Sequence, residues 1–396
     1  MAVQPAAEPA PQPVLSPLTA AAVFLVLTID PGGEQVVSDF LADLSGLQRS
    51  VAFRLPEGAL QAVAAIGSDA WDRLFSGPRP AELHPFRELT GPRHHAPATP
   101  GDLLFHVRAN RMDLCFEFAA QVMARLSGVT TVADEVQGFR YFDERDLIGF
   151  VDGTESPQGA PGVAAAIIGE DRDPDFAGGS YVIIQKYLHD LPSWNGITVE
   201  EQERAIGRSK LADIEMPDDV KPANSHVALN TVTDADGDQL QIVRANMPFG
   251  NPGRGEFGTY FISYAAQPAV TEEMLSNMFI GRPPGNTDRI LDFSTAITGG
   301  NFFAPSADFL DSPPGLPAAA IDAQASAGAQ PADVIDAQPA EAVPGDGSLG
   351  IGSLSSSGGT AFRHGGLQAP SHMGGSRPPS PQAIPPGPRT PRPHAR

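Results

Sequence analysis

Residues Ala20–Ile29 read Ala-Ala-Ala-Val-Phe-Leu-Val-Leu-Thr-Ile, an unbroken apolar run that ends at Asp30 and Pro31. The run is too short for a membrane-spanning helix, which needs about 20 apolar residues. Met1–Pro17, which precedes it, contains neither Lys nor Arg, so it lacks the features of a secretion or twin-arginine signal. We therefore predict a disordered N-terminus over 1–17, a buried strand at Ala20–Ile29 and a cytoplasmic protein.

Further strands and helices follow this strand along the chain, without a regular βα alternation. The predicted strands are Ala21–Ile29, Ser50–Leu55, Leu103–Arg108, Gln137–Phe142, Ser180–Leu188, Gln241–Met247 and Gly258–Ala265. The predicted helices are Glu34–Leu47, Asp113–Leu126, Val199–Lys210 and Thr271–Phe279. This mixture is typical of an α+β fold with antiparallel sheets. The length fits two ferredoxin-like subdomains, 18–145 and 146–310.

Composition limits the partners and the organisation of the chain. The 396 residues carry a net charge of −21, which argues against binding to nucleic acid or to an anionic membrane. Cys115 is the only cysteine, so no disulfide can form within the chain. Segment 311–396 is rich in Pro, Gly and Ser, and Phe362 is its only aromatic residue. We predict that this tail is disordered, since it cannot bury enough apolar surface to offset its conformational entropy.

The run Gly149–Thr154 reads Gly-Phe-Val-Asp-Gly-Thr and places the carboxylate of Asp152 between a strand-like segment and a glycine turn. Glycine allows a ligand to approach the backbone closely. A carboxylate held on such a turn can act as a general base, although Asp-Gly pairs also occur in ordinary turns.

Two further segments supply groups for a polar pocket. Arg244 and Asn246 share one face if Gln241–Met247 is a strand, either as salt-bridged structure or as a pocket wall. His226 lies in Asn224–Asn230, and the sequence lacks the paired His or Cys spacing of a zinc site. One histidine nevertheless suffices for a metal that arrives in haem.

Together these groups form the inventory of a haem peroxidase. A base, Asp152, would move a proton between the two oxygens of hydrogen peroxide. A fixed guanidinium, Arg244, would stabilise the charge on the leaving oxygen. His226 would bind iron, helped by an acceptor for its other ring nitrogen.

The chain resembles the dye-decolourising peroxidases, in particular the bacterial subgroup with compact loops. Gly149–Thr154 matches their Gly-x-x-Asp-Gly-Thr signature, and His226 and the Arg244-x-Asn246 pair follow in the same order. Leu103–Ala109 and Ile206–Lys210 are also similar to that family. The resemblance covers roughly residues 15–310.

The resemblance implies a role for each matching residue. Haem b would be bound by His226 as the proximal ligand, and Asp152, Arg244 and Asn246 would form the distal side. Arg208 would pair with a haem propionate, near Gly153 and Thr154 of the signature. Asp288 would accept a hydrogen bond from His226, with Asp292 as the alternative. The substrates implied are hydrogen peroxide and a reducing dye or phenolic compound, and a homo-oligomer is expected.

For the further candidates, ordinary packing or solvation is an equally good or a better explanation. Possible porphyrin contacts are Phe261, Met274, Leu291 and Phe293; possible electron relays are Trp194, Tyr187 and Tyr264; possible manganese ligands are Glu155 and Glu215. Because a free Asp titrates near ~4, an Asp152 base predicts an acidic optimum.

Within the tail, Asp346–Leu354 repeats Gly-Ser-Leu and carries the bulky apolar residues Leu349, Ile351 and Leu354. A linker is the simpler reading. The segment resembles the cargo-loading peptides that direct such peroxidases into encapsulin shells, although Ser355 follows where a basic residue is usual, and the chain continues to Arg396. Two alternative functions remain at this stage: a haem- or porphyrin-handling protein with incidental peroxidase activity, and a shell-recruited binding module.

Overall fold

The computed structural model describes residues 9–318 and 320–321. Its main feature is a 10-stranded antiparallel sheet, in the order β10-β12-β7-β14-β2-β5-β1-β6, with β11 on β12 and β13 on β7. The strands are β1 (Ala21–Ile29), β2 (Gln61–Gly67), β5 (Leu103–Ala109), β6 (Thr130–Phe139), β7 (Ser180–His189), β10 (Val243–Arg244), β11 (Met247–Asn251), β12 (Glu256–Ala265), β13 (Ser294–Ala296) and β14 (Gly300–Ala304). The small hairpins are β3 (Leu89–Thr90) with β4 (His95–Ala96), and β8 (Val232–Thr233) with β9 (Gln239–Leu240).

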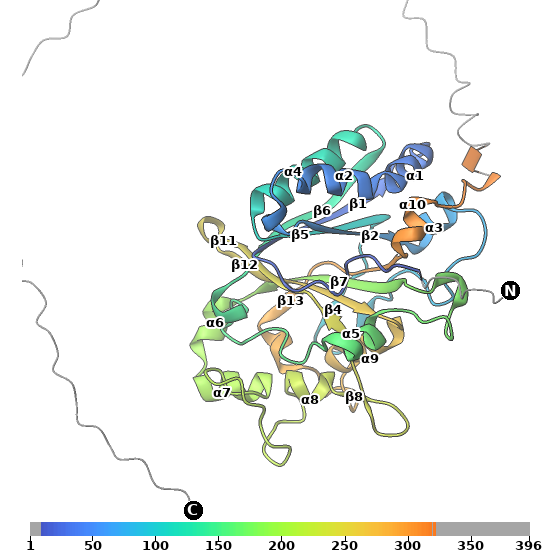
Figure 1. Ribbon diagram of the computed structural model, residues 1–396. Coiled ribbons are helices and arrows are strands. Elements are labelled where there is room, and N and C mark those ends of the chain that lie inside the picture. The colour runs from blue at the N-terminus through green and yellow to red at the C-terminus, as the bar shows by residue number, and fades with distance from the viewer. Residues whose placement is uncertain (1–8, 319, 322–396) are drawn as a thin grey trace, which may run out of the picture. The chain divides into compact units, whose positions relative to one another are not determined.

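The sheet folds over so that Phe24 of β1 and Tyr260 of β12 meet between its two halves, and the helices form two groups outside these halves, as Figure 1 shows. The first group is α1 (Glu34–Ala42), α2 (Leu44–Ala52), α3 (Ser68–Leu74), α4 (Met112–Arg125) and α10 (Ala307–Asp311); the second is α5 (Gly159–Ala166), α6 (Leu191–Gly196), α7 (Val199–Ile206), α8 (His226–Asn230) and α9 (Pro268–Phe279). Short 3₁₀ turns are η1 (Pro56–Gly58), η2 (Phe142–Glu144), η3 (Pro174–Phe176), η4 (Pro252–Arg254) and η5 (Arg289–Asp292). Among the residues described, no helix is long and apolar enough to cross a membrane.

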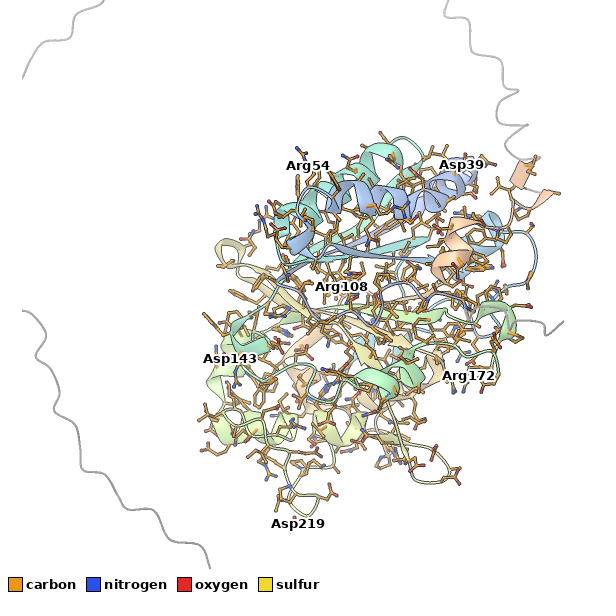
Figure 2. All side chains as sticks on the ribbon, in the orientation of Figure 1. Asp39, Arg54, Arg108, Asp143, Arg172 and Asp219 are labelled. Carbon is orange, nitrogen blue, oxygen red and sulfur yellow. The ribbon has the colours of Figure 1, made fainter. Side chains whose placement is uncertain are left out.

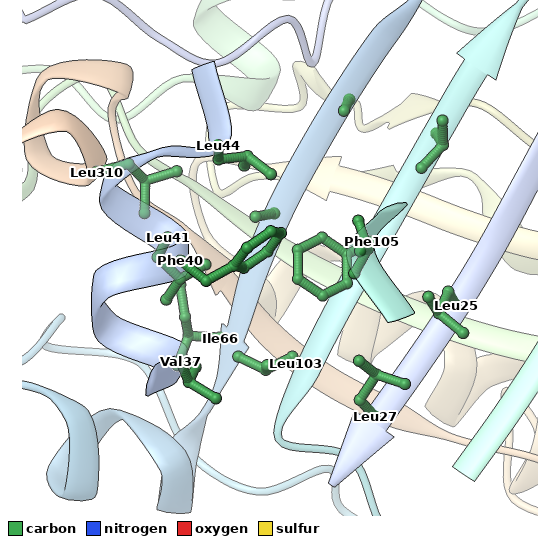
Figure 3. Close-up of a cluster of buried hydrophobic side chains, with 14 of the residues drawn as sticks. Leu25, Leu27, Val37, Phe40, Leu41, Leu44, Ile66, Leu103, Phe105 and Leu310 are labelled. Carbon is green, nitrogen blue, oxygen red and sulfur yellow. The ribbon is translucent and has the colours of Figure 1, made fainter. Parts of the chain in front are cut away.

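The apolar run at the start of the chain forms β1 and is buried on both faces. Leu25 and Leu27 pack toward α1 and α2 together with Phe105, as Figure 3 shows. Phe24 points to the other side and stacks on Tyr260 with ring centroids 4.2 Å apart. A strand buried on both faces must be apolar at every position, which explains the absence of polar alternation in this sequence.

The expected α+β fold with antiparallel strands is confirmed, and its ferredoxin-like halves form one continuous sheet. One predicted strand is wrong: Ser50–Leu55 begins within α2, where Leu47 and Val51 lie on its buried face. The true second strand is β2, whose alanine-rich sequence has low intrinsic strand propensity and is held by pairing with β5 and β14. The predicted helix Glu34–Leu47 is divided at Asp43 into α1 and α2.

A buried cation ties the N-terminal segment to the sheet. Arg108 on β5 is fully buried in the middle of the molecule, whereas Arg54 and Asp39 lie at its periphery, as Figure 2 shows. The Arg108 guanidinium donates to the backbone carbonyls of Ser16, at 3.1 Å, and of Pro13. The segment around these residues is therefore part of the folded structure, contrary to the predicted disorder of 1–17 for the part that is described.

Candidate active site

A hollow with about 910 Å³ of empty space, part of it open to solvent, forms a cavity between the sheet and helices α8 and α9. Apolar side chains form most of its wall, among them Ile148, Val151, Ile206, Phe261, Met274 and Met278. A neighbouring hollow of about 1700 Å³ shares Asp152, His226 and Arg244 with it, so the two form one cleft. Two of the predicted porphyrin contacts, Phe261 and Met274, line this cleft, whereas Leu291 and Phe293 belong to neighbouring core clusters.

His226 is the first residue of α8, a one-turn helix that Ser225 caps through its hydroxyl. The His226 Nδ1 lies 2.8 Å from Oδ2 of Asp288. Asp288 is only 1% exposed, and its other oxygen accepts the backbone N–H of Ile290 at 3.0 Å. The carboxylate makes Nδ1 the protonated nitrogen, and no described residue forms a hydrogen bond with Nε2, so this lone pair is available to a ligand in the cleft.

Asp292, the other residue that the sequence suggested as an acceptor for His226, contacts different side chains. It pairs with Arg93 and Arg289 and lies 3.3 Å from Nε2 of His94. The structure therefore brings Asp288, and not Asp292, into contact with His226.

Asp152 stands on the far wall of the cleft, on the turn that the sequence suggested. Gly149 and Gly153 on either side have φ of +93° and +86°, values that residues with a Cβ rarely adopt. A Cβ at Gly149 would also come within 2.5 Å of the Lys210 side chain. The turn is held by an antiparallel bridge between Arg145 and Val151. These two glycines let the chain reverse so that Asp152 faces the cleft.

Asn246 fixes the orientation of the Asp152 carboxylate. Its Nδ2 lies 3.2 Å and 3.1 Å from the two Asp152 oxygens, and its Oδ1 accepts the backbone N–H of Ile262 at 3.0 Å. The backbone contact determines which end of the amide faces Asp152. The predicted strand Gln241–Met247 is interrupted here, because β10 ends at Arg244 and β11 begins at Met247.

Arg244 supplies the positive charge of this wall. Its backbone N–H donates to the Ser156 hydroxyl at 3.1 Å, and its Nε is buried without a hydrogen-bond partner among the described residues. Burial raises the pKa of the Asp152 carboxyl, the Arg244 guanidinium opposes that rise, and the negative charge of Asp146 adds to it. A buried guanidinium with an unmatched donor is suited to a small anion or to developing negative charge.

Arg208, the predicted propionate partner, is already surrounded by acidic groups. It lies 2.9 Å from Asp213, 2.8 Å from Glu155 and 3.4 Å from Glu215. Thr154 belongs to the same cluster, since its hydroxyl donates to Asp213 at 2.7 Å. Arg208, Gly153 and Thr154 all line the larger hollow. No group of three acidic, His or Cys side chains among the described residues has the geometry of a metal site, so Glu155 and Glu215 stay a prediction as manganese ligands.

The three candidate relays are buried in different surroundings. Tyr187 lines the cavity and donates to Gln185 at 2.6 Å. Trp194 packs between Phe150 and Phe293, and its indole N–H donates to the carbonyl of Ile148 at 2.9 Å. Tyr264 lies on the opposite face of the sheet, 2.7 Å from Nδ1 of His106.

Sequence reasoning missed a polar cluster in the cavity wall. Asp146 and His189 form an ion pair of 3.2 Å, and Thr259 and Ser294 bind to its two members. All four line the same cavity as Asp152. Two signals were available: Asp146 stands just before the glycine signature, and His189 ends a mostly apolar strand.

The cleft has the features that haem requires. An apolar wall matches a porphyrin, His226 presents one nitrogen while Asp288 orients the other, and Arg244 has an unmatched buried donor. The segment Asp346–Leu354, with Leu349, Ile351 and Leu354, lies outside the described residues.

Comparison with known proteins agrees with this chemistry. Residues 11–140 and 143–309 match the N-terminal and C-terminal family models of Dyp-type peroxidases. The dye-decolorizing peroxidase of Rhodococcus erythropolis is 64% identical over 344 residues, which cover 87% of this chain and 96% of that protein. The encapsulated DyP-type peroxidase of Mycobacterium smegmatis has a TM-score of 0.77 and 68% identity over 78% of this chain and all of that one. A variant of Rhodococcus jostii DypB in complex with heme has a TM-score of 0.75 and 54% identity, covering 77% of this chain and 99% of that one.

Proposed function

The chain belongs to the Dyp-type peroxidase family and is a peroxidase, and from this premise we propose that it reduces hydrogen peroxide with haem b while oxidising dyes or phenolic donors. The observation that carries the proposal is the pairing of His226 with Asp288 across the cleft from the Asp152–Asn246 pair. His226 on one wall would hold the haem iron, and Asp152 on the other wall would transfer the proton.

Haem would supply an iron that binds peroxide and accepts electrons from the donor. Asp152 accepts a proton from one peroxide oxygen and returns it to the other, which leaves as water. Asn246 holds the carboxylate in place through both oxygens. Arg244 directs positive charge to the leaving oxygen as that oxygen becomes negative.

On the opposite wall, Asp288 keeps the proton of His226 on Nδ1 and makes the ring a stronger donor to the metal. Arg208, Gly153 and Thr154 would receive a propionate at the edge of the cleft. Because Arg208 already contacts three acidic residues, a propionate would replace Glu155 or Glu215 as its partner. Bidentate pairing favours this exchange.

The absorption spectrum of the purified protein tests the cofactor and its ligand. We expect a Soret band after haem loading that is lost in His226→Ala and retained in His84→Ala, which removes a histidine that pairs with Glu272 instead. The proposal would be contradicted if the protein shows no Soret band after incubation with haem, or if the band is unchanged in His226→Ala. Peroxide turnover that survives in Asp152→Asn would contradict the role of Asp152 and favour a haem-handling protein.

We further propose that Asp346–Leu354 recruits the enzyme into an encapsulin shell in the cytoplasm. The support is the Gly-Ser-Leu repeat with three bulky apolar residues and the high similarity to a peroxidase that is described as encapsulated. Co-expression with a shell protein should yield loaded shells for the full chain. Replacing Leu349, Ile351 and Leu354 by Ser should leave empty shells, whereas the change Ser355→Ala should not.

Two organisational predictions also remain proposals. The division into subdomains at 145/146 can be tested by limited proteolysis, and the expected homo-oligomer by light scattering of the haem-loaded protein.

A further inference from the structure

We propose that Asp146 and His189 are positioning residues that hold the turn of Asp152 and set the pH at which Asp152 exchanges its proton. This inference rests on the proposed role of Asp152. It concerns a buried ion pair in the cavity wall that the peroxide chemistry described above does not use.

Asp146 is built into the turn that carries Asp152. Its backbone N–H donates to the carbonyl of Phe150, its carbonyl accepts from Gly149, each at 2.8 Å, and its Oδ1 accepts from the N–H of Ile148 at 3.2 Å. Backbone and side chain of Asp146 together thus organise the segment from 146 to 150, and Asp152 follows directly after Val151.

The same carboxylate is anchored to two strands of the sheet directly and to a third through His189. Nε2 of His189, at the end of β7, lies 3.2 Å from Oδ1 of Asp146, and the Thr259 hydroxyl on β12 donates to Oδ2. Nδ1 of His189 lies 2.7 Å from the Ser294 hydroxyl on β13. The side chains of His189 and Asp146 are 3% and 14% exposed. This degree of burial and bonding fixes the turn against the rigid part of the fold.

The pair also determines the charge next to Asp152. The charged and titratable groups around Asp152 are Arg244 on β10, His226 on α8, and Glu144, Arg145 and Asp146 on its own loop. His189 on β7 faces Asp146, and its charge lowers the pKa of Asp146 against the effect of burial. The net charge next to Asp152 therefore depends on both members of the pair, the carboxylate of Asp146 and the imidazole that faces it.

Opposite changes at the two positions should therefore move Asp152 in opposite directions. Asp146→Asn removes the negative charge and keeps an oxygen for the N–H of Ile148, so the midpoint of Asp152 should fall by about one pH unit. His189→Gln keeps a donor for Asp146 but cannot carry a charge, so the midpoint should rise. Asp143→Asn removes an exposed negative charge from the same loop, outside this cluster, and is the matched control, with a shift near zero.

The experiment is an infrared titration of the carboxylic acid band of Asp152 in the haem-loaded protein, assigned by its loss in Asp152→Asn. The pH profile of peroxide turnover is measured in parallel, and melting temperature and haem content verify folding. Opposite shifts in Asp146→Asn and His189→Gln support the inference. Shifts in the same direction, or none in folded protein, overturn it. If Asp152→Asn retains full turnover, the proposed function fails instead, so the two failures are distinguishable.

Discussion

The two halves of the sheet present different surfaces to their helices. In the first half, Leu25, Leu27 and Phe105 fill space below α1, α2 and α4 together with other apolar side chains. In the second half, β7 and β12 place His189, Thr259 and Phe261 below α8 and α9, and a cavity remains. Related halves of one fold have thus taken separate tasks: the filled half supplies stability, and the open half supplies chemistry.

The largest effect is expected from a change in the open half that leaves packing intact. Asp152→Asn preserves the shape of the side chain but cannot transfer the proton, so peroxide turnover should fall by about 10²–10⁴-fold. Steady-state and single-turnover kinetics measure this loss. Asp143→Asn, an exposed change in the same loop, is the control, and an equal loss there would show that the loop and not the base is responsible.

A change in the filled half should do the reverse. Phe105 is fully buried and meets Phe40 edge-on at 5.9 Å. Phe105→Ala should reduce the free energy of unfolding by about 3–5 kcal/mol, while turnover per folded, haem-loaded molecule changes little. Denaturant titration provides the measurement. Phe53→Ala removes the same side chain from a position that is 84% exposed, and it should be nearly neutral.

Asp288 tests whether the open half depends on buried support. In Asp288→Asn the amide donates toward Nδ1 of His226 and forces the proton onto Nε2, so retention of haem or activity should fall by about 10–100-fold. A haem-transfer assay measures the effect. Asp292→Asn should leave haem retention unchanged because Asp292 pairs with Arg93 and Arg289 instead. Equal losses in both variants would remove the distinction between them.

The smallest expected effect is on the pH dependence of kcat/KM and of the melting temperature. Burial raises the pKa of Asp152, so its base form is lost as pH falls through a value above the ordinary ~3.9. The acid limb of kcat/KM should lie correspondingly higher than for a free carboxyl. The same raised pKa destabilises the folded state as pH rises through it, so Asp152→Asn should raise the melting temperature at pH 7 and not at pH 3. A gain at pH 3 as well would point to packing.

The sequence alone predicted the elements whose local pattern agrees with their tertiary environment. β1, α4 and β7 carry clear apolar patterns and were located to within a residue or two. β2 was missed because its alanines become a strand only through pairing on both sides. In the cleft, Asp152 and His226 were found through motifs. The Asp146–His189 pair was not found, because its two residues come from separate segments that no sequence motif connects.

The N-terminal segment has a consequence for the order in which the chain is made. Gln12 donates to the carbonyl of Pro305 at 2.9 Å, and the backbone of Ala10 bonds to Ala307 and to the side chain of Asp308, each at 2.7 Å. Gln12 and Pro13 can meet Ala64 and Arg108 early in synthesis, but the contacts with Pro305, Ala307 and Asp308 can form only after that later segment has emerged from the ribosome. Until then Gln12 and the strand beside it have no complete site. The fold closes late in synthesis, and a ribosome-bound chain that stops before α10 should remain sensitive to protease at its N-terminal segment.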